Sequence, residues 1–163
     1  MINAAGKPAP PGGGAGDYSG PVRWEYRPRL NGTPDPGEIV WTWVAYEDAP
    51  QIGKDRPVVV IGLANRGRLA VLMLSTRDHS GDSRWLAIGP GDWDEQYRPS
   101  WVRGDRILAV VPEAIRREGS VLAQEAYEAI RAEFGPRDSR LRSSIRRLFG
   151  RSRPSKVTPT VPT

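Results

Sequence analysis

Residues 38–46 read Glu-Ile-Val-Trp-Thr-Trp-Val-Ala-Tyr, and residues 57–62 read Pro-Val-Val-Val-Ile-Gly. Both stretches are rich in β-branched and aromatic side chains, which fit the pleated surface of a sheet, so each predicts a strand. The polar segment 47–55 between them contains a proline and a glycine and predicts a loop. Proline at the first position of the second strand fits there, because a missing N–H does least damage at a strand start.

Further short strands follow, separated by turn signals. Residues 69–75 (Leu-Ala-Val-Leu-Met-Leu-Ser) predict a third strand. Residues 84–88 and 100–111 predict shorter strands, the last of them interrupted at Gly104. Short strands with frequent turns are typical of a barrel or a sandwich. We therefore predict that residues 37–110 form a small β-barrel.

The last third of the chain changes from strand to helix patterning. Pro112 suits the first turn of a short helix that Gly119 would end. Ser120 would then cap a longer helix that ends at Gly135 and Pro136. Apolar residues return with a helical period along this longer segment. The predicted fold class is therefore mainly β with a C-terminal helix.

Both ends of the chain differ in composition from the body. Residues 1–21 are mostly small residues, glycine and proline without apolar periodicity, which predicts a disordered extension. Residues 22–135 hold the predicted barrel and helix. Near the start of this domain, Trp24 and Tyr26 are expected to dock on the body, since large rings gain most from burial. Residues 136–163 form a basic, partly disordered tail.

The positive charge of the chain is concentrated in this tail. The net charge is +5, yet residues 136–163 carry eight basic residues and one acidic residue, whereas the other 135 residues carry 16 basic and 18 acidic ones. Such a tail can hold RNA, DNA or an anionic membrane by counterion release. The alternatives are a solvated extension or, over residues 141–149, a basic amphipathic helix. The body itself is mildly acidic.

Composition excludes several kinds of site. The chain has no cysteine, which excludes a disulfide, a thiolate nucleophile and a cysteine-based zinc site. We predict neither a metal nor another cofactor. No apolar run approaches the roughly 18 residues that a membrane span needs, and the start lacks the apolar core of a secretory signal. We therefore expect a cytoplasmic protein with no membrane partner.

Two places combine residues suited to phosphate chemistry. Arg56 directly precedes a buried strand, where its planar guanidinium is held rigidly enough to bind phosphate. Ser75 and Thr76 end the third strand, and the only histidine, His79, follows. Hydroxyls donate to phosphate oxygens, and imidazole transfers protons near neutral pH. The plainer interpretation of each group is a solvated polar surface.

A third place is the pair Arg103 and Asp105. The two residues lie two positions apart in a predicted strand, so they share one face of the sheet. They could form an ordinary surface ion pair. They could equally act as an acid/base couple beside a phosphate.

Four motifs, taken in order, resemble those of the PemK/MazF-type toxin family, in an actinobacterial-like, divergent branch. They are Gly37-Glu38-Ile39-Val40-Trp41, Gly53 with Arg56-Pro57-Val58-Val59-Val60, Leu72 to Thr76, and Val102-Arg103-Gly104-Asp105. The resemblance covers about residues 37–130, and the first two motifs carry most of it. It implies an SH3-like barrel of the PemK/MazF/CcdB type with a C-terminal helix. It also implies a homodimer, a cognate antitoxin lying over the dimer groove, and cleavage of single-stranded RNA (mRNA) without a metal.

The resemblance implies catalytic roles residue by residue. Arg56 would stabilise charge on the phosphorus, and Ser75, with Thr76 beside it, stands where the family usually has threonine. Asp105 would be the base and Arg103 the acid when the RNA 2′-OH attacks its own phosphorus, leaving a 2′,3′-cyclic phosphate. Arginine is a poor acid because its pKa lies far above neutrality. Arg103 therefore suits charge stabilisation, and His79 competes for a proton-transfer role.

Two departures from the family pattern bear on activity. Serine replaces threonine at position 75, and the loop 46–53 is acidic, which would oppose RNA unless its carboxylates bind arginine. One alternative to a ribonuclease toxin is a degenerate barrel that binds nucleic acid or a protein partner without cleavage. Another is the gyrase-poisoning branch of the same fold, which acts by protein contact.

Overall fold

The fold comes from a computed structural model that describes residues 6–29 and 31–137. In this part of the chain the elements are β1 (Lys7–Pro8), β2 (Gly16–Asp17), β3 (Arg23–Trp24), β4 (Glu38–Ala45), β5 (Ile52–Leu63), β6 (Leu69–Ser75), β7 (Trp85–Gly89), β8 (Ser100–Arg103), β9 (Leu108–Val110), β10 (Arg116–Val121) and α1 (Gln124–Phe134). The mainly β fold with a C-terminal helix that the sequence predicted is confirmed.

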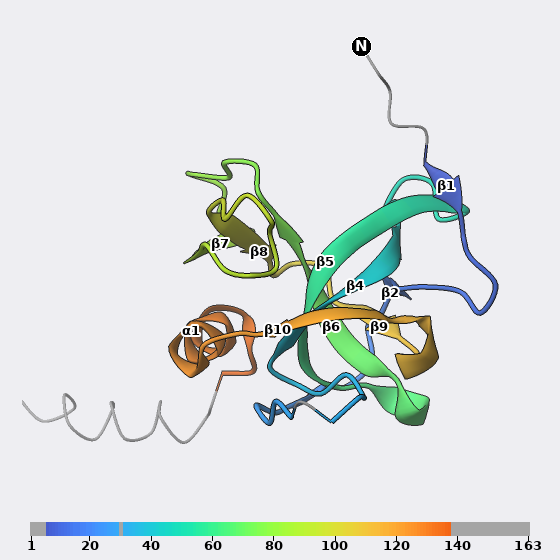
Figure 1. The fold of residues 1–163 in the computed structure, drawn as a ribbon, viewed down its shortest axis with the longest axis horizontal. Helices are drawn as coiled ribbons and strands as arrows, with labels where there is room; N and C mark the ends of the chain where they lie inside the picture. The colour runs from blue at the N-terminus through green and yellow to red at the C-terminus, as the bar shows by residue number, and fades with distance from the viewer. Residues whose placement is uncertain (1–5, 30, 138–163) are drawn as a thin grey trace, which may run out of the picture.

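The sheet is antiparallel and strongly curled, with the strand order β10-β4-β5-β6-β8-β7 (Figure 1). Two long strands are shared between neighbours. The first part of β5 pairs with β4, and its second part pairs with β6. In turn, β6 pairs with β9 at its start and with β8 at its end. Curled strands that change partners in this way let a small sheet bend into a barrel.

Two apolar clusters lie on opposite faces of the central strands. Ile39, Val59 and Ile61 belong to the cluster that α1 covers, whereas Val58 and Val60 belong to a second cluster on the other face. Successive strand residues point to opposite faces, so a strand buried on both sides reads as a continuous apolar run. This double burial explains the unbroken Val-Val-Val-Ile sequence in β5.

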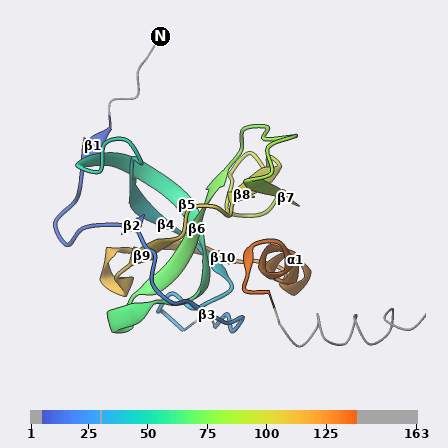
Figure 2. The same cartoon turned by 180° about the vertical axis from the view of Figure 1, so that it is seen from behind.

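Helix α1 lies beside β7 at one side of the molecule, while β1 and β9 lie at the other (Figures 1 and 2). Tyr127 and Ile130 on its inner face are buried in the first cluster. The expected docking of Trp24 and Tyr26 is confirmed. Both rings pack on Tyr127, and the Tyr26 hydroxyl donates to the carbonyl of Leu122 at 2.7 Å. Among the described residues, no helix is long and apolar enough to span a membrane.

The second strand is longer than the sequence predicted. It begins at Ile52, inside the predicted loop 47–55, and Pro57 lies in its interior opposite Trp41. The β4–β5 pairing extends to Gly53 and thereby makes a strand of a polar segment. Pairing with β6 begins only at Val58, so Pro57 stands where β5 has a single neighbour, and a sheet tolerates proline there.

The predicted short helix over 112–119 is wrong. A single 3-10 turn, Pro112–Ala114, is followed by β10, which pairs with the outer edge of β4. Ser120 lies opposite Ile39 in this strand and does not cap a helix, and α1 begins after Ala123. An available sheet edge outweighs a local helical preference, because the edge satisfies backbone hydrogen bonds along the whole segment.

The predicted disorder of residues 1–21 does not hold over residues 6–21. Here β1 pairs with β5, and β2 pairs with β9. Glycine and proline gave no strand signal, but the exposed ends of β5 and β9 offer hydrogen bonds that this segment completes. Residues 1–5 of the predicted extension, and all of the basic tail beyond residue 137, lie outside the described residues.

Candidate functional site

A pocket opens where β5 and β6 separate. The two strands pair as far as Val58 and Met73, beyond which β6 pairs with β8. The next residues on that same face, Arg56 on β5 and Ser75 on β6, both line the opening. We call this cavity of about 440 Å³ the basic pocket. Its charged lining residues are Lys54, Arg56, Arg77, Arg98, Arg103, Arg106, Glu47 and Asp94.

The pocket gathers most of the residues that the sequence singled out. Five of the six catalytic candidates line it, namely Arg56, Ser75, Thr76, His79 and Arg103. They come from the start of β5, the end of β6 with its following loop, and the end of β8. The sixth candidate, Asp105, lies just outside, in a smaller hollow beside the pocket.

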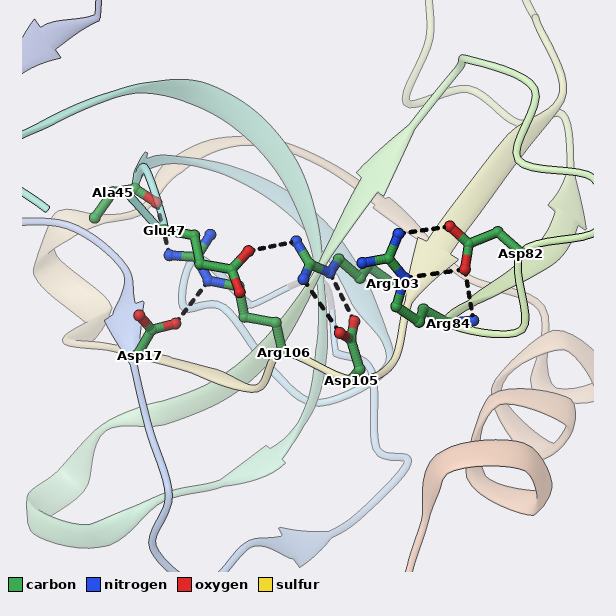
Figure 3. Close-up of polar contacts among 8 residues, drawn as sticks. All are labelled: Asp17, Ala45, Glu47, Asp82, Arg84, Arg103, Asp105 and Arg106. Carbon is green, nitrogen blue, oxygen red and sulfur yellow. Dashed lines mark hydrogen bonds and ion pairs between the residues drawn. The ribbon is translucent and has the colours of Figure 1, made fainter. Parts of the chain in front are cut away.

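Arg103 is held between two carboxylates (Figure 3). Its guanidinium donates to both oxygens of Asp105, at 2.6 and 3.1 Å, and lies 3.0 Å from Glu47. The hydrogen bonds from Arg103 lower the pKa of Asp105, and the same bonds raise the pKa of Arg103. Asp105 is therefore a weakened base, and Arg103 remains a fixed cation. The acidic loop 46–53 would oppose RNA unless its carboxylates bind arginine. Glu47 of that loop does bind one, Arg103.

Three other cations of the pocket have no such partner. Within the described residues, the side chains of Lys54, Arg56 and Arg77 make neither a hydrogen bond nor an ion pair. Burial and then the charges of neighbouring arginines lower the pKa of half-buried Arg56. The charge of Arg56, followed by burial, likewise lowers the pKa of Lys54. Partly desolvated cations that repel one another favour an anionic ligand, which would relieve both effects.

Ser75 and His79 form a hydroxyl–imidazole pair at the same opening. Ser75 Oγ lies 3.1 Å from His79 Nε2 and accepts a hydrogen bond from the backbone N–H of Arg77 at 3.2 Å. The imidazole stacks on Trp85, with 3.7 Å between ring centroids and 5° between the planes, and meets Trp101 edge-on. The stacked rings fix the direction of Nε2, so the pair is set up to pass a proton.

A comparison with protein families agrees with this architecture. Residues 35–135 match the family described as PemK-like, MazF-like toxins of type II toxin-antitoxin systems. The chain belongs to this toxin family. No curated protein matches the toxin. The matched segment contains all six candidates, Arg56 to Asp105, but begins after β1, β2 and β3.

No metal site accompanies the pocket of the toxin in the part that the structure describes. Over residues 6–29 and 31–137, no three side chains of histidine, aspartate or glutamate gather closely enough to hold an ion. The half-buried rings of Trp41 and Trp85 form part of the pocket wall. Aromatic faces next to unpaired cations are the combination that single-stranded nucleic acids bind, through base stacking and phosphate contacts.

The sequence did not single out Arg77, Arg98 or Arg106, which also line the pocket, and Arg106 is the buried one of the three. Arg106 is buried to 7% exposure, and its guanidinium donates to Asp17 at 2.6 Å and to the carbonyl of Ala45 at 2.8 Å. A signal for it was present: like Arg56, it directly precedes an apolar run that forms a buried strand. Asp17 had no such signal, since it lies in the segment predicted to be disordered.

Proposed function

We propose that this toxin is an endoribonuclease that cuts single-stranded RNA, and mRNA in particular, in the basic pocket without a metal. One observation carries the proposal. The pocket presents three cations without carboxylate partners next to an ordered hydroxyl–imidazole pair. This arrangement supplies both parts of phosphodiester chemistry, charge stabilisation and proton transfer.

The unpaired cations and the aromatic walls supply substrate recognition. A phosphate replaces the water around Arg56, Lys54 and Arg77, and charge-assisted hydrogen bonds form in a site partly shielded from solvent. Bases stack on the half-buried rings of Trp41 and Trp85 that line the pocket. These contacts require separated bases, which single strands offer and duplexes do not.

The reaction that fits these groups is an internal transfer of the phosphodiester. The ribose 2′-OH attacks the adjacent phosphorus, a new O2′–P bond forms, and the P–O5′ bond breaks. The products are a 2′,3′-cyclic phosphate and a free 5′-OH. Arg56 and Arg103 stabilise the extra negative charge on the phosphorane oxygens. Ser75 and Thr76 donate to a phosphate oxygen, and His79 carries the proton of the attacking 2′-OH to the leaving O5′. Asp105 keeps Arg103 in place.

A second function, binding without cleavage, is favoured by the position of Asp105. The family resemblance assigned it the role of base, yet it lies outside the pocket with both oxygens bound by Arg103. If His79 does not replace it, the pocket retains phosphate affinity without turnover. Such a barrel would bind nucleic acid, or a protein partner that presents anionic groups.

Family membership supports the remaining parts of the proposal. A toxin of a type II system has an antitoxin as its partner. We extend this to a homodimer whose groove the antitoxin peptide covers, acting in the cytoplasm, where mRNA is found. Size-exclusion chromatography with light scattering measures the mass in solution, and the mass of a monomer would contradict the dimer.

Growth arrest and cleavage together test the proposed function. Induced expression of the wild-type chain should arrest growth, and Arg56→Ala should abolish the arrest because it removes one of the three unpaired cations of the pocket. The purified protein should cut a single-stranded RNA in the presence of EDTA and should leave the same strand intact when every 2′-OH is replaced by hydrogen. Arrest that survives both Arg56→Ala and Asp105→Ala would reject the nuclease mechanism. Binding of RNA without cleavage would establish the second function instead.

A further inference from the structure

A segment that precedes the family match contacts Arg106, one of the residues that line the basic pocket. We call residues 6–24 the N-terminal arm, which contains β1, β2 and β3. Ala15 in the arm is fully buried, and its N–H donates to the carbonyl of Trp43 at 2.8 Å while its carbonyl accepts from Ala45 at 3.1 Å. The approach is so close that a Cβ on Gly14 would lie 2.5 Å from the Trp43 carbonyl oxygen. Only glycine fits there, so the arm is built to lie on the barrel.

The arm places Asp17 against Arg106. Arg106 Nε donates to Asp17 Oδ1 at 2.6 Å, and its Nη2 donates to the carbonyl of Ala45 at 2.8 Å (Figure 3). Arg106 is 7% exposed, and Asp17 supplies its carboxylate partner. A buried guanidinium that loses its counter-charge is strongly disfavoured. Asp17, together with the Ala45 carbonyl, therefore holds the guanidinium of Arg106 in place.

Arg106 stands between two hollows. One is the basic pocket, and the other is a cavity of about 290 Å³ that Asp17 and Asp105 line. The two carboxylates thus lie behind the arginines Arg106 and Arg103, away from the unpaired cations. The charge of Arg106 acts inside the pocket. Burial is the main cause of the lowered pKa of Arg56, and the charge of Arg106 lowers it further.

We propose that Asp17 is a positioning residue that fixes Arg106 for contact with a substrate phosphate, which makes the N-terminal arm part of the substrate-binding machinery. This inference rests on the proposed function, since the phosphate belongs to single-stranded RNA. Arg106 contributes its charge to the pocket wall, and Asp17 acts only through it. The arm thereby adds to the site a residue from outside the matched segment 35–135.

The test uses the full-length chain and a double-mutant cycle. Affinity is measured for a 2′-O-methyl single strand, which binds but cannot be cut, and KM and kcat are measured on the corresponding RNA. Asp17→Ala should weaken affinity and raise KM about tenfold, with kcat changed much less. Asp17→Glu should recover most of the loss. In the Arg106→Ala background, Asp17→Ala should have no further effect, because its action passes through that arginine.

Glu25→Ala is the matched control. Glu25 also pairs with arginines, Arg23 at 3.3 Å and Arg27 at 3.2 Å, but does not line the basic pocket. It should leave affinity unchanged.

If Asp17→Ala does not fold, Asp17→Asn takes its place, since it keeps the shape and one acceptor and removes only the charge. Wild-type affinity in folded Asp17→Ala or Asp17→Asn, or additive losses in the cycle, would overturn the inference alone. If the wild-type chain binds the strand but does not cut RNA, the nuclease function is rejected, and the double-mutant cycle still tests the role of Asp17. If the wild-type chain binds no strand, both the nuclease function and the inference about Asp17 are overturned.

Discussion

The arginines of the basic pocket differ in what surrounds them, and this difference separates their roles. Arg103 and Arg106 are fixed by carboxylates, whereas Arg56 has no carboxylate partner among the described residues. A fixed arginine offers a rigid charge for a developing phosphorane, and an unpaired one offers hydrogen bonds to an incoming phosphate. The basic pocket thus contains both preorganised and available positive charge.

If RNA binds in the basic pocket as proposed, Glu47 competes with it for Arg103, and removal of Glu47 tests this competition. Glu47→Gln frees one side of the Arg103 guanidinium and removes a negative charge from the pocket, so single-stranded RNA should bind roughly two- to fivefold more tightly. The melting temperature should hardly change, because the Glu47 side chain is 54% exposed and exposed ion pairs contribute little to stability. Fluorescence titration with a 2′-O-methyl strand measures the affinity. Asp48→Asn, the same charge change one residue away and off the pocket lining, is the control. Weaker binding in Glu47→Gln would show that Glu47 positions Arg103 instead.

The sequence predicts those site residues whose place follows from a local strand pattern, and it misses contacts between distant parts of the chain. Arg56, Ser75 and Arg103 were found because each lies at an end of an apolar run that predicts a strand. The Asp17–Arg106 contact joins residues 89 positions apart, and no local pattern encodes it. The split of charge between paired and unpaired arginines also depends on three-dimensional proximity.

At the scale of elements, α1 is anchored to the sheet through Tyr127. Its hydroxyl donates to the carbonyl of Ile61 at 2.7 Å, and the ring is almost fully buried between Trp24, Tyr26 and the core. The helix therefore depends on β3 and the residues after it, which carry the two other rings, and these segments and the core stabilise one another.

Tyr127 makes stability fall at high pH. Burial raises the pKa of Tyr127 from 10.0 to about 12. Because the folded state holds this proton more tightly than the unfolded chain, the contribution is complete below pH 10 and declines as the pH rises from 10 towards 12. Urea unfolding at pH 8 and at pH 11 measures the loss. Tyr127→Phe should cost about 1 kcal/mol at pH 8 and should unfold with a smaller difference between the two pH values. An equal difference in wild type and variant would contradict this account.

The elements that the sequence predicts are those with an intrinsic pattern. The strands β4 and β6 were predicted almost residue for residue, since apolar β-branched runs fill them. Three strands were missed, namely β1, β2 and β10. They form because they pair with edges of the sheet, and their sequences carry little apolar periodicity. Edge pairing is a tertiary effect that local propensity does not reveal.

At the scale of the whole molecule, charge is distributed in a way that the net value hides. The part of the chain before residue 136 has more acidic than basic residues, yet six of the charged groups lining the basic pocket are cations and two are carboxylates. A mildly acidic body with a basic pocket directs an anionic ligand to that pocket.

The basic tail should add affinity for RNA without adding specificity. Deletion of residues 136–163 removes a net charge of +7. RNA binding should weaken, and the plot of log affinity against log salt should become flatter by about 0.7 for every phosphate that the tail neutralises in the full-length chain. Filter binding at several salt concentrations measures the slope. A tail of unchanged length with its arginines replaced by glutamine should behave like the deletion. An unchanged slope would reject this role.

The chemistry of the cut ends tests the central claim most directly. Wild-type protein, a single-stranded RNA and EDTA are incubated, and mass spectrometry identifies the termini of the fragments. We predict a 2′,3′-cyclic phosphate on one fragment and a 5′-hydroxyl on the other, with at least about a hundredfold slower release by Arg56→Ala. Fragments ending in a 5′-phosphate, or equal rates in wild type and Arg56→Ala, would contradict an attack by the 2′-OH in the basic pocket.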